Sequence, residues 1–140
     1  MNVLIDTNVV LDVLLRREPY YKDSMRVIVL SEKKYIDGIV SASAITDIYY
    51  IVRKAIKNRD FAIDLLKRLT KVIGVGSVID RHIYEALELE WDDFEDSIQY
   101  VVGKSIGVEY IVTRNPQDFS AAAIRAISPQ EFLRAFASGV

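Results

Sequence analysis

The chain of 140 residues has no cysteine, a single histidine and no glycine-rich loop for nucleotide phosphates. Without cysteine, disulfides, thiol nucleophiles and zinc sites with cysteine ligands are excluded. There is no Walker loop, and Gly74-Val75-Gly76 lacks the third glycine that a dinucleotide-binding motif requires. The chemistry of this chain must therefore come from other side chains, above all its carboxylates.

Long uncharged runs are absent as well. No stretch approaches the ~20 apolar residues that a membrane helix needs. The start MNVLIDTN lacks the basic and apolar regions of a signal peptide. We therefore expect a soluble, cytoplasmic protein without a membrane partner. By length we expect one domain over residues 1–140, able to bury roughly two-thirds of its unfolded surface.

An excess of positive charge is also missing. The chain has 18 basic and 20 acidic residues, for a formal net charge of −2. A protein that holds nucleic acid mainly by electrostatic attraction is usually basic, so this class is disfavoured. A catalyst that contacts a few phosphates through metal ions stays possible, because the ion brings its own positive charge.

Short apolar runs alternate with segments in which apolar residues recur at helical spacing. We predict strands over residues 2–5, 35–40, 72–75 and 109–113, with a fifth at 126–127. We predict helices from Asp6-Thr7-Asn8 to Glu18-Pro19, over 20–34, from Ser41 to about 57, from Asn58, from Ser77, over 93–106 and from Ser128. This alternation predicts a three-layer α/β/α fold with a mostly parallel sheet of four to five strands.

Several single residues receive a structural interpretation. We expect Phe61 to face inward from the fourth helix and Ser77 to cap the fifth. The lone His82 is interpreted as structural or surface, and Trp91 as a packing residue. The third helix is apolar over more than one stripe, which suggests a homodimer seam along helices three and four. A strict monomer in sedimentation at high concentration would contradict that seam.

Polar residues gather where the predicted strands end. In an open parallel sheet, ligands bind outside the carboxyl ends of the strands. The residues that fall there or in the adjacent helix turns are Asp6, Asn8, Asp47, Asp93, Asp96, Thr113, Arg114, Asn115 and Asp118. Carboxylates brought together repel one another, and a hard divalent cation such as Mg²⁺ or Mn²⁺ relieves that repulsion. This constellation of acids favours phosphodiester hydrolysis over zinc chemistry.

Several of these residues also have a simpler interpretation. Asp6 and Asn8 could cap the first helix, and Asp47 could favour the positive end of its helix dipole. Asp92 or Asp93 could be a cap, which leaves Asp96, deeper in its helix, as the preferred ligand. Asp118 could be a turn residue.

Four motifs together resemble the PIN domain and its short bacterial branch, which includes the VapC-type toxins. They are Asp6-Thr7-Asn8, residues 43–50, residues 93–97 and residues 111–119. The resemblance extends from Met1 to about Phe136, and the ordered set is specific although no single motif is. It implies a Mg²⁺- or Mn²⁺-dependent ribonuclease, usually dimeric, whose toxin members are often inhibited by an antitoxin protein.

The resemblance also implies site residues. Asp6 and Asp96 match the first and third invariant acids, and Asp47 matches the second, where most relatives have glutamate. In the last cluster Asp118 matches an acid, Thr113 a hydroxyl residue and Asn115 a position that is often aspartate. The shorter Asp47 and the uncharged Asn115 favour a single metal over two.

We accordingly expect Asp6, Asp96, Asp118 and Asp93 to bind the metal, with Asp47 completing the catalytic acids. We expect Asn8, Thr113, Arg114 and Asn115 to orient ligands or to contact RNA. A catalytically silent PIN-like scaffold is the alternative, because Asp47 is short and Asn115 uncharged. An aspartyl-phosphate phosphatase is disfavoured, because Asn8 stands where a second aspartate is needed. A receiver domain is disfavoured as well, because this chain lacks the paired acids after the first strand and the lysine after a late strand that such a domain requires.

Overall fold

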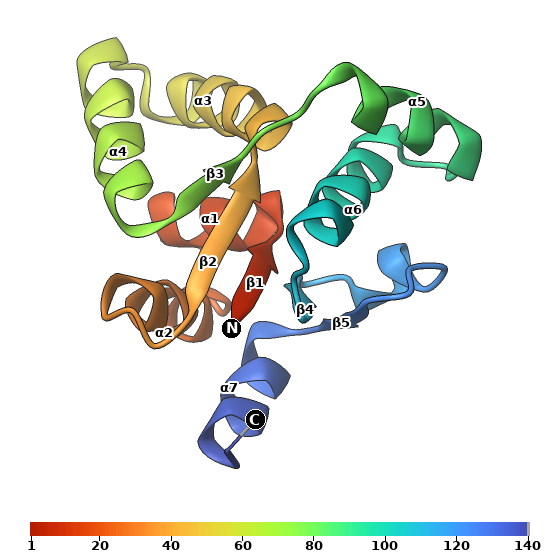
Figure 1. Ribbon diagram of the computed structural model, residues 1–140. Helices are drawn as coiled ribbons and strands as arrows, with labels where there is room; N and C mark the ends of the chain where they lie inside the picture. The colour runs from red at the N-terminus through yellow and green to blue at the C-terminus, as the bar shows by residue number, and fades with distance from the viewer. Residues whose placement is uncertain (140) are drawn as a thin grey trace.

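The computed structural model describes residues 1–139, in which strands and helices alternate along the chain (Figure 1). In order, the elements are β1 (Asn2–Ile5), α1 (Thr7–Leu14), α2 (Tyr21–Glu32), β2 (Asp37–Ser41), α3 (Ala42–Ile56), α4 (Arg59–Val72), β3 (Gly74–Gly76), α5 (Asp80–Leu89), α6 (Phe94–Ile106), β4 (Tyr110–Val112), the 3-10 helix η1 (Pro116–Phe119), β5 (Arg125–Ile127) and α7 (Pro129–Ala137).

The five strands form one sheet in the order β3-β2-β1-β4-β5, and every neighbouring pair is parallel. The chain leaves the central strand β1 toward β2 on one side and returns to β4 on the other. Such a point of reversal is where open parallel sheets bind ligands. Because Ile5 pairs with Val112, the residues that follow them, Asp6 and Thr113, lie side by side at the sheet edge.

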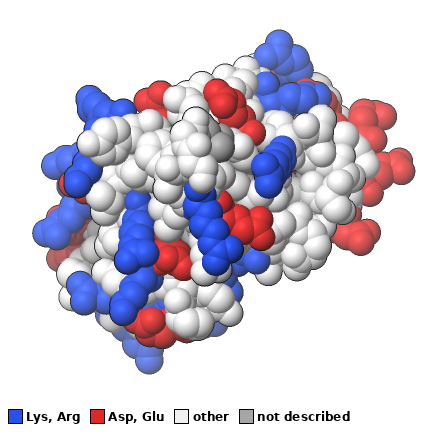
Figure 2. Space-filling view, turned by 90° about the horizontal axis from the view of Figure 1, so that it is seen from below, with Lys and Arg blue, Asp and Glu red and all other residues white. Residues whose placement is uncertain are grey.

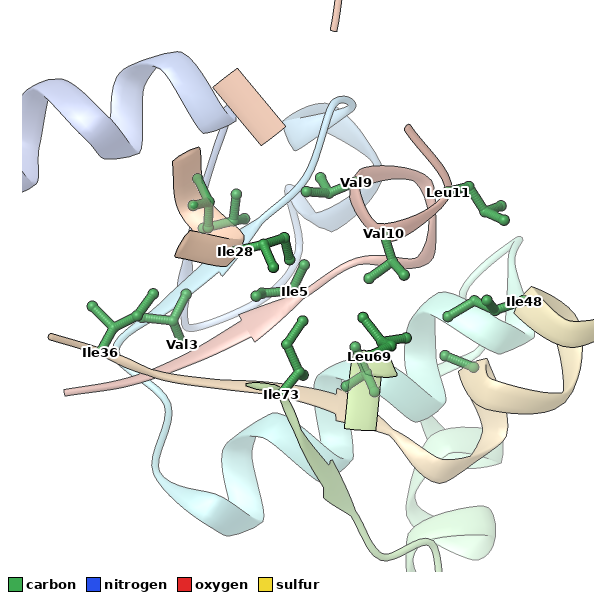
Figure 3. Packing of buried hydrophobic residues seen from close by; sticks show 14 of the residues in the cluster. Val3, Ile5, Val9, Val10, Leu11, Ile28, Ile36, Ile48, Leu69 and Ile73 are labelled. Carbon is green, nitrogen blue, oxygen red and sulfur yellow. The ribbon is translucent and has the colours of Figure 1, made fainter. Parts of the chain in front are cut away.

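Helices cover both faces of the sheet, so the predicted three-layer α/β/α fold is confirmed (Figure 1). Successive strand residues point to opposite faces, and β1 shows this clearly. Val3 and Ile5 belong to a core formed with α1, α2, α3, α4 and α7, and Figure 3 shows them among side chains from the first four of these helices. Leu4 points the other way, into a core with α5, α6 and Phe119.

Helix α6 approaches β1 closely at a glycine. A Cβ at Gly103 would lie 3.1 Å from Val108 Cγ2 and 3.4 Å from Leu4 Cδ2, so a larger residue would push the helix outward. Gly107, with φ of 82°, ends the helix in the left-handed conformation that glycine adopts without strain. This close packing keeps the first turns of α6 near the end of β1.

Three local expectations differ from the structure. Helix α5 begins at Asp80, not after Ser77, because Nδ1 of the buried His82 accepts the Ile79 N–H at 3.1 Å and fixes the start there. Phe61 was expected inside but is 49 % exposed, whereas its neighbour Ala62 is buried. The 3-10 helix η1 was not predicted, because four residues are too few to show helical periodicity.

Basic side chains are unevenly distributed over the surface. Figure 2 views the molecule from the side of the strands' amino ends and shows Lys and Arg gathered on the left, where Figure 1 places α2 and α4. Acids gather at the right edge of that view. None of the helices over residues 1–139 is long and apolar enough to cross a membrane.

Candidate active site

Asp6 lies at the edge of the sheet where the strands have their carboxyl ends, and it is the acid that hydrogen bonds hold most firmly there. It follows β1 directly, is the N-cap of α1, and its N–H donates to the Val112 carbonyl at 3.0 Å. Thr113 Oγ1 donates to its Oδ2 at 2.7 Å, and the Thr7 N–H donates to its Oδ1 at 2.7 Å. Asp6 therefore caps its helix and, at the same time, holds a buried carboxylate at the junction of β1 and β4.

Burial raises the pKa of the Asp6 carboxyl above its ordinary value. Its hydrogen bonds with Thr113, Gln99 and Thr7 act in the opposite direction, and the charge of Asp118 adds to the increase. Burial affects the pKa of Asp6 more than these hydrogen bonds do, because no cationic side chain among residues 1–139 contacts the carboxylate. Asp6 would consequently gain from a positive charge placed beside it.

The first turn of α6 supplies the next acids. Asp93 is exposed and caps the helix, since its Oδ1 accepts the Asp96 N–H at 3.0 Å. Asp96 lies half-buried on the side of Asp6. Burial, followed by the charges of Asp6, Asp93 and Asp118, raises the pKa of Asp96 to about 7. The structure thus makes Asp93 a cap and keeps Asp96 free of that task, as the residue order had suggested.

A pocket of about 390 Å³ collects all five predicted acids. It is lined by Asp6, Thr7, Asn8, Leu11, Asp47, Tyr50, Ile51, Asp93, Glu95, Asp96, Gln99 and Asp118. An adjoining hollow of about 430 Å³ shares Asp93, Asp96 and Asp118 with it. Acids from the end of β1, from α3, from the start of α6 and from η1 thus meet in one place.

Two polar side chains that line the pocket, Glu95 and Gln99, were not predicted as site residues from the sequence. Burial, and then the charge of Asp47, raises the pKa of Glu95 to about 7. Gln99 is 1 % exposed, and its Nε2 donates to Asp6 Oδ1 at 3.0 Å. Glu95 directly precedes the preferred ligand Asp96, so its position in the acidic run was the available signal. Gln99 lies inside the apolar run 98–102 and three residues after Asp96, and that position was the available signal for a buried amide near the acids.

Three predicted residues, Thr113, Arg114 and Asn115, do not line the pocket, whereas Asn8 does. Thr113 is fully buried on Asp6, and its Oγ1 accepts the Asn115 N–H at 3.1 Å. The Arg114 N–H donates to Asn8 Oδ1 at 3.3 Å. The Arg114 guanidinium turns away from the pocket, since its Nε lies 2.7 Å from Asp12 and its Cζ lies 4.1 Å from the centre of the Tyr20 ring.

The donor set of the pocket fits a hard divalent cation. All candidate ligands are oxygens, several carboxylates have raised pKa values, and one oxygen each of Glu95 and Gln99 is buried without a hydrogen-bond partner. Mg²⁺ and Mn²⁺ prefer such ligands and retain several waters. Within residues 1–139, however, no three acidic or histidine side chains already form a metal cage. Cation binding therefore requires the carboxylates to move closer or to act through water.

Comparison with known proteins agrees with this arrangement. The PIN domain family model matches residues 2–117. The Aquifex aeolicus protein Ribonuclease VapC1 is 27 % identical over 135 residues, which cover 93 % of this chain and 92 % of that protein.

Solved structures share the fold at low sequence identity. VapBC2 from Rickettsia felis, bound to a DNA fragment of its promoter, has a TM-score of 0.70 at 14 % identity and covers 91 % of this chain and 98 % of its own. VapC20 from Mycobacterium tuberculosis, a toxin that cleaves the sarcin–ricin loop, has a TM-score of 0.64 at 16 % identity and covers 78 % and 86 %. At these identities the likeness concerns the fold.

Proposed function

The chain belongs to the PIN domain family, and on this premise we propose that it is a divalent-metal-dependent endoribonuclease that acts as the toxin of a toxin–antitoxin module. The observation that carries the proposal is the meeting of Asp6 and Asp96 in one pocket without a cationic side chain to neutralise them. The named activities of the Aquifex and Mycobacterium relatives support RNA as the substrate.

Asp6 and Asp96 are the main ligands of a Mg²⁺ or Mn²⁺ ion in this proposal. Asp118 and Asp93 add negative charge from the exposed side of the pocket, and Asp47 completes it. When bound, such a cation activates a water molecule and offsets the charge of the phosphate. Because Asn115 brings no charge to the last cluster, one cation is expected.

The other residues of the site hold these acids in place. Thr113 fixes Oδ2 of Asp6, so the opposite oxygen, Oδ1, faces Gln99 and Asp96. Asn8 accepts the Arg114 N–H and thereby ties the loop after β4 to helix α1. A phosphate contact by Arg114 stays a prediction, because its guanidinium lies on Asp12.

An antitoxin protein and a second copy of the chain are the proposed protein partners. Solved toxin–antitoxin complexes such as that from Klebsiella pneumoniae share the fold, which supports the first. For the second, Tyr50 on α3 and Phe61 on α4 are 65 % and 49 % exposed, which supports a homodimer seam along these two helices although Phe61 was expected to face inward.

The proposal is tested by replacing one charge at a time. Asp6→Asn and Asp96→Asn should each lower RNA cleavage in Mn²⁺ at least about 100-fold, because each removes a charged oxygen where the cation binds. Cleavage is measured on labelled RNA with and without a chelator, and circular dichroism checks the fold. Asp60→Asn, at a side chain that is 94 % exposed, is the control for net charge and should retain full activity.

Full activity in either site variant, or wild-type cleavage that survives the chelator, would refute the assignment. A silent scaffold is the second candidate, and it is favoured by the absence of a preformed metal cage within residues 1–139. It predicts that wild-type protein binds RNA but does not cut it.

A further inference from the structure

A buried glutamine lies between the two central acids of the pocket. Gln99 is on α6, one turn after Asp96, and its Nε2 donates to Asp6 Oδ1 at 3.0 Å and to Asp96 Oδ1 at 3.5 Å. Its Oε1 is buried and has no hydrogen-bond partner among the described residues. The NH₂ group of Gln99 thus donates to both acids, whereas its carbonyl oxygen accepts no hydrogen bond from the described residues.

The direction of this amide follows from chemistry. An ionised carboxylate only accepts hydrogen bonds, so the NH₂ group has to face Asp6 and Asp96 and the carbonyl has to face away. A buried carbonyl without a donor is unfavourable by itself. The arrangement is therefore maintained by the two acids, which need a donor more than the carbonyl does.

Among the described residues, no other side chain donates hydrogen bonds to both Asp6 and Asp96. Thr113 binds the opposite oxygen of Asp6, and the Thr7 N–H belongs to the helix cap. Among residues 1–139, no Lys or Arg lines the pocket. Gln99 is thus the group through which Asp6 and Asp96 share a partially positive neighbour, and a divalent cation would be attracted to the same two oxygens for the same reason.

We propose that the Gln99 amide and a divalent cation compete for Oδ1 of Asp6 and Oδ1 of Asp96, so that Gln99 sets the affinity of the pocket for the cation. A bound cation would occupy the lone pairs that now accept from Nε2. The amide would then lose both of its hydrogen bonds to the acids. This inference rests on the proposed function only in requiring that a cation binds the pocket.

The test compares Gln99→Met with the wild-type protein. Methionine has a similar length but no donor, so cation binding no longer has to break two hydrogen bonds. We expect Mn²⁺ to bind on the order of ten-fold tighter in calorimetric titration, the size expected for one hydrogen bond to a charged group. With chelator present, the thermal midpoint should fall by roughly 4 °C, because both acids lose a donor. Gln130→Met, at an exposed glutamine on α7, should change neither value.

Unchanged or weaker Mn²⁺ binding in Gln99→Met would overturn the competition, and weaker binding would instead make the amide a supporting ligand. If the variant does not fold, the wild-type side-chain amide signals of Gln99 in a ¹⁵N NMR spectrum decide the question. They should shift when Mg²⁺ saturates the protein, and signals that stay in place would refute the proposal.

Failure of this inference can be distinguished from failure of the proposed ribonuclease function. A wild-type protein that binds Mn²⁺ but leaves RNA intact would contradict the ribonuclease and leave the competition standing. A protein that cleaves RNA while Gln99→Met binds Mn²⁺ with unchanged affinity would contradict the competition alone. A wild-type protein that binds no Mn²⁺ would overturn both.

Discussion

Two buried aspartates, one just before helix α1 and one within it, are treated in opposite ways by the fold. Asp6 and Asp12 are 6 % and 0 % exposed, and burial raises the pKa of both carboxyl groups. Asp12 has its own cations, Arg114 at 2.7 Å and Arg17 at 4.0 Å. Asp6 has only neutral donors and further acids around it.

The difference separates a structural acid from a candidate functional one. A buried charge that the chain neutralises by itself has no need of an external ion, whereas one surrounded by like charges does. The neutralised pair supports the site indirectly, because Arg114 stands between Thr113 and Asn115 and anchors their loop to α1. Three predictions test this contrast, in decreasing order of expected effect.

The largest effect is expected from Arg114→Met. It leaves Asp12 buried with only the distant Arg17, and breaking a buried ion pair from one side costs about 3–5 kcal/mol of unfolding free energy. Urea unfolding measures the loss. Arg68→Met, which breaks an exposed pair with Asp64, should cost less than about 1 kcal/mol. If the two losses were equal, Asp12 and Arg114 would not be a structural pair.

The second effect concerns the acids without a cationic partner. The folded-state pKa of Glu95 and of Asp96 is about 7, above the ordinary values of 4.5 and 3.8. Protons are therefore held more tightly in the folded state, so their stabilising effect is complete below about pH 4 and is lost as the pH rises through 7. With chelator present, the unfolding free energy should fall by about 2 kcal/mol over that range, after allowance for solvent screening.

The double variant Glu95→Gln/Asp96→Asn should flatten this decline, because neither side chain titrates. Denaturant unfolding at several pH values between 4 and 8 measures the slope. A slope as steep as that of the wild-type protein would show that the pH dependence comes from other groups, with Asp12 the first to consider.

The smallest effect is expected at the exposed edge of the pocket. Asp47 is exposed on α3, so lengthening it to glutamate costs little stability and extends its reach toward the other acids. Asp47→Glu should tighten Mn²⁺ binding roughly three-fold, because carboxylate ligands must approach the ion closely. Calorimetry measures this, and weaker binding would remove Asp47 from the ligand set.

The order of strands, helices and acids was readable from the sequence because local patterns encode it. Apolar runs predicted the strands, and parallel pairing then placed Asp6 beside Thr113. The PIN-like fold predicted from the four motifs is confirmed by the family match over residues 2–117. Helix ends were less predictable, because the start of α5 depends on the His82 ring.

Partnerships between distant side chains were not readable. Asp12 lies in an apolar helical run and Arg114 beside the acids of the last motif, so the sequence suggested a phosphate contact for Arg114 and nothing for Asp12. The role of Gln99 likewise depends on tertiary packing, because the Gln99 amide reaches Asp6 only when α6 packs against β1. Such contacts depend on the completed fold.

The hydrogen bond between Thr113 and Asp6 joins residues 107 positions apart, and it has a consequence for synthesis on the ribosome. The central strand β1 is synthesised well before its neighbour β4, so one edge of β1 stays unpaired while the elements between them are made. Contacts of such separation also form slowly. A chain translated only as far as α6 would contain Asp6 but not Thr113, so the central acid of the candidate site would lack the hydrogen bond that fixes its Oδ2 until β4 and the residue after it had been made.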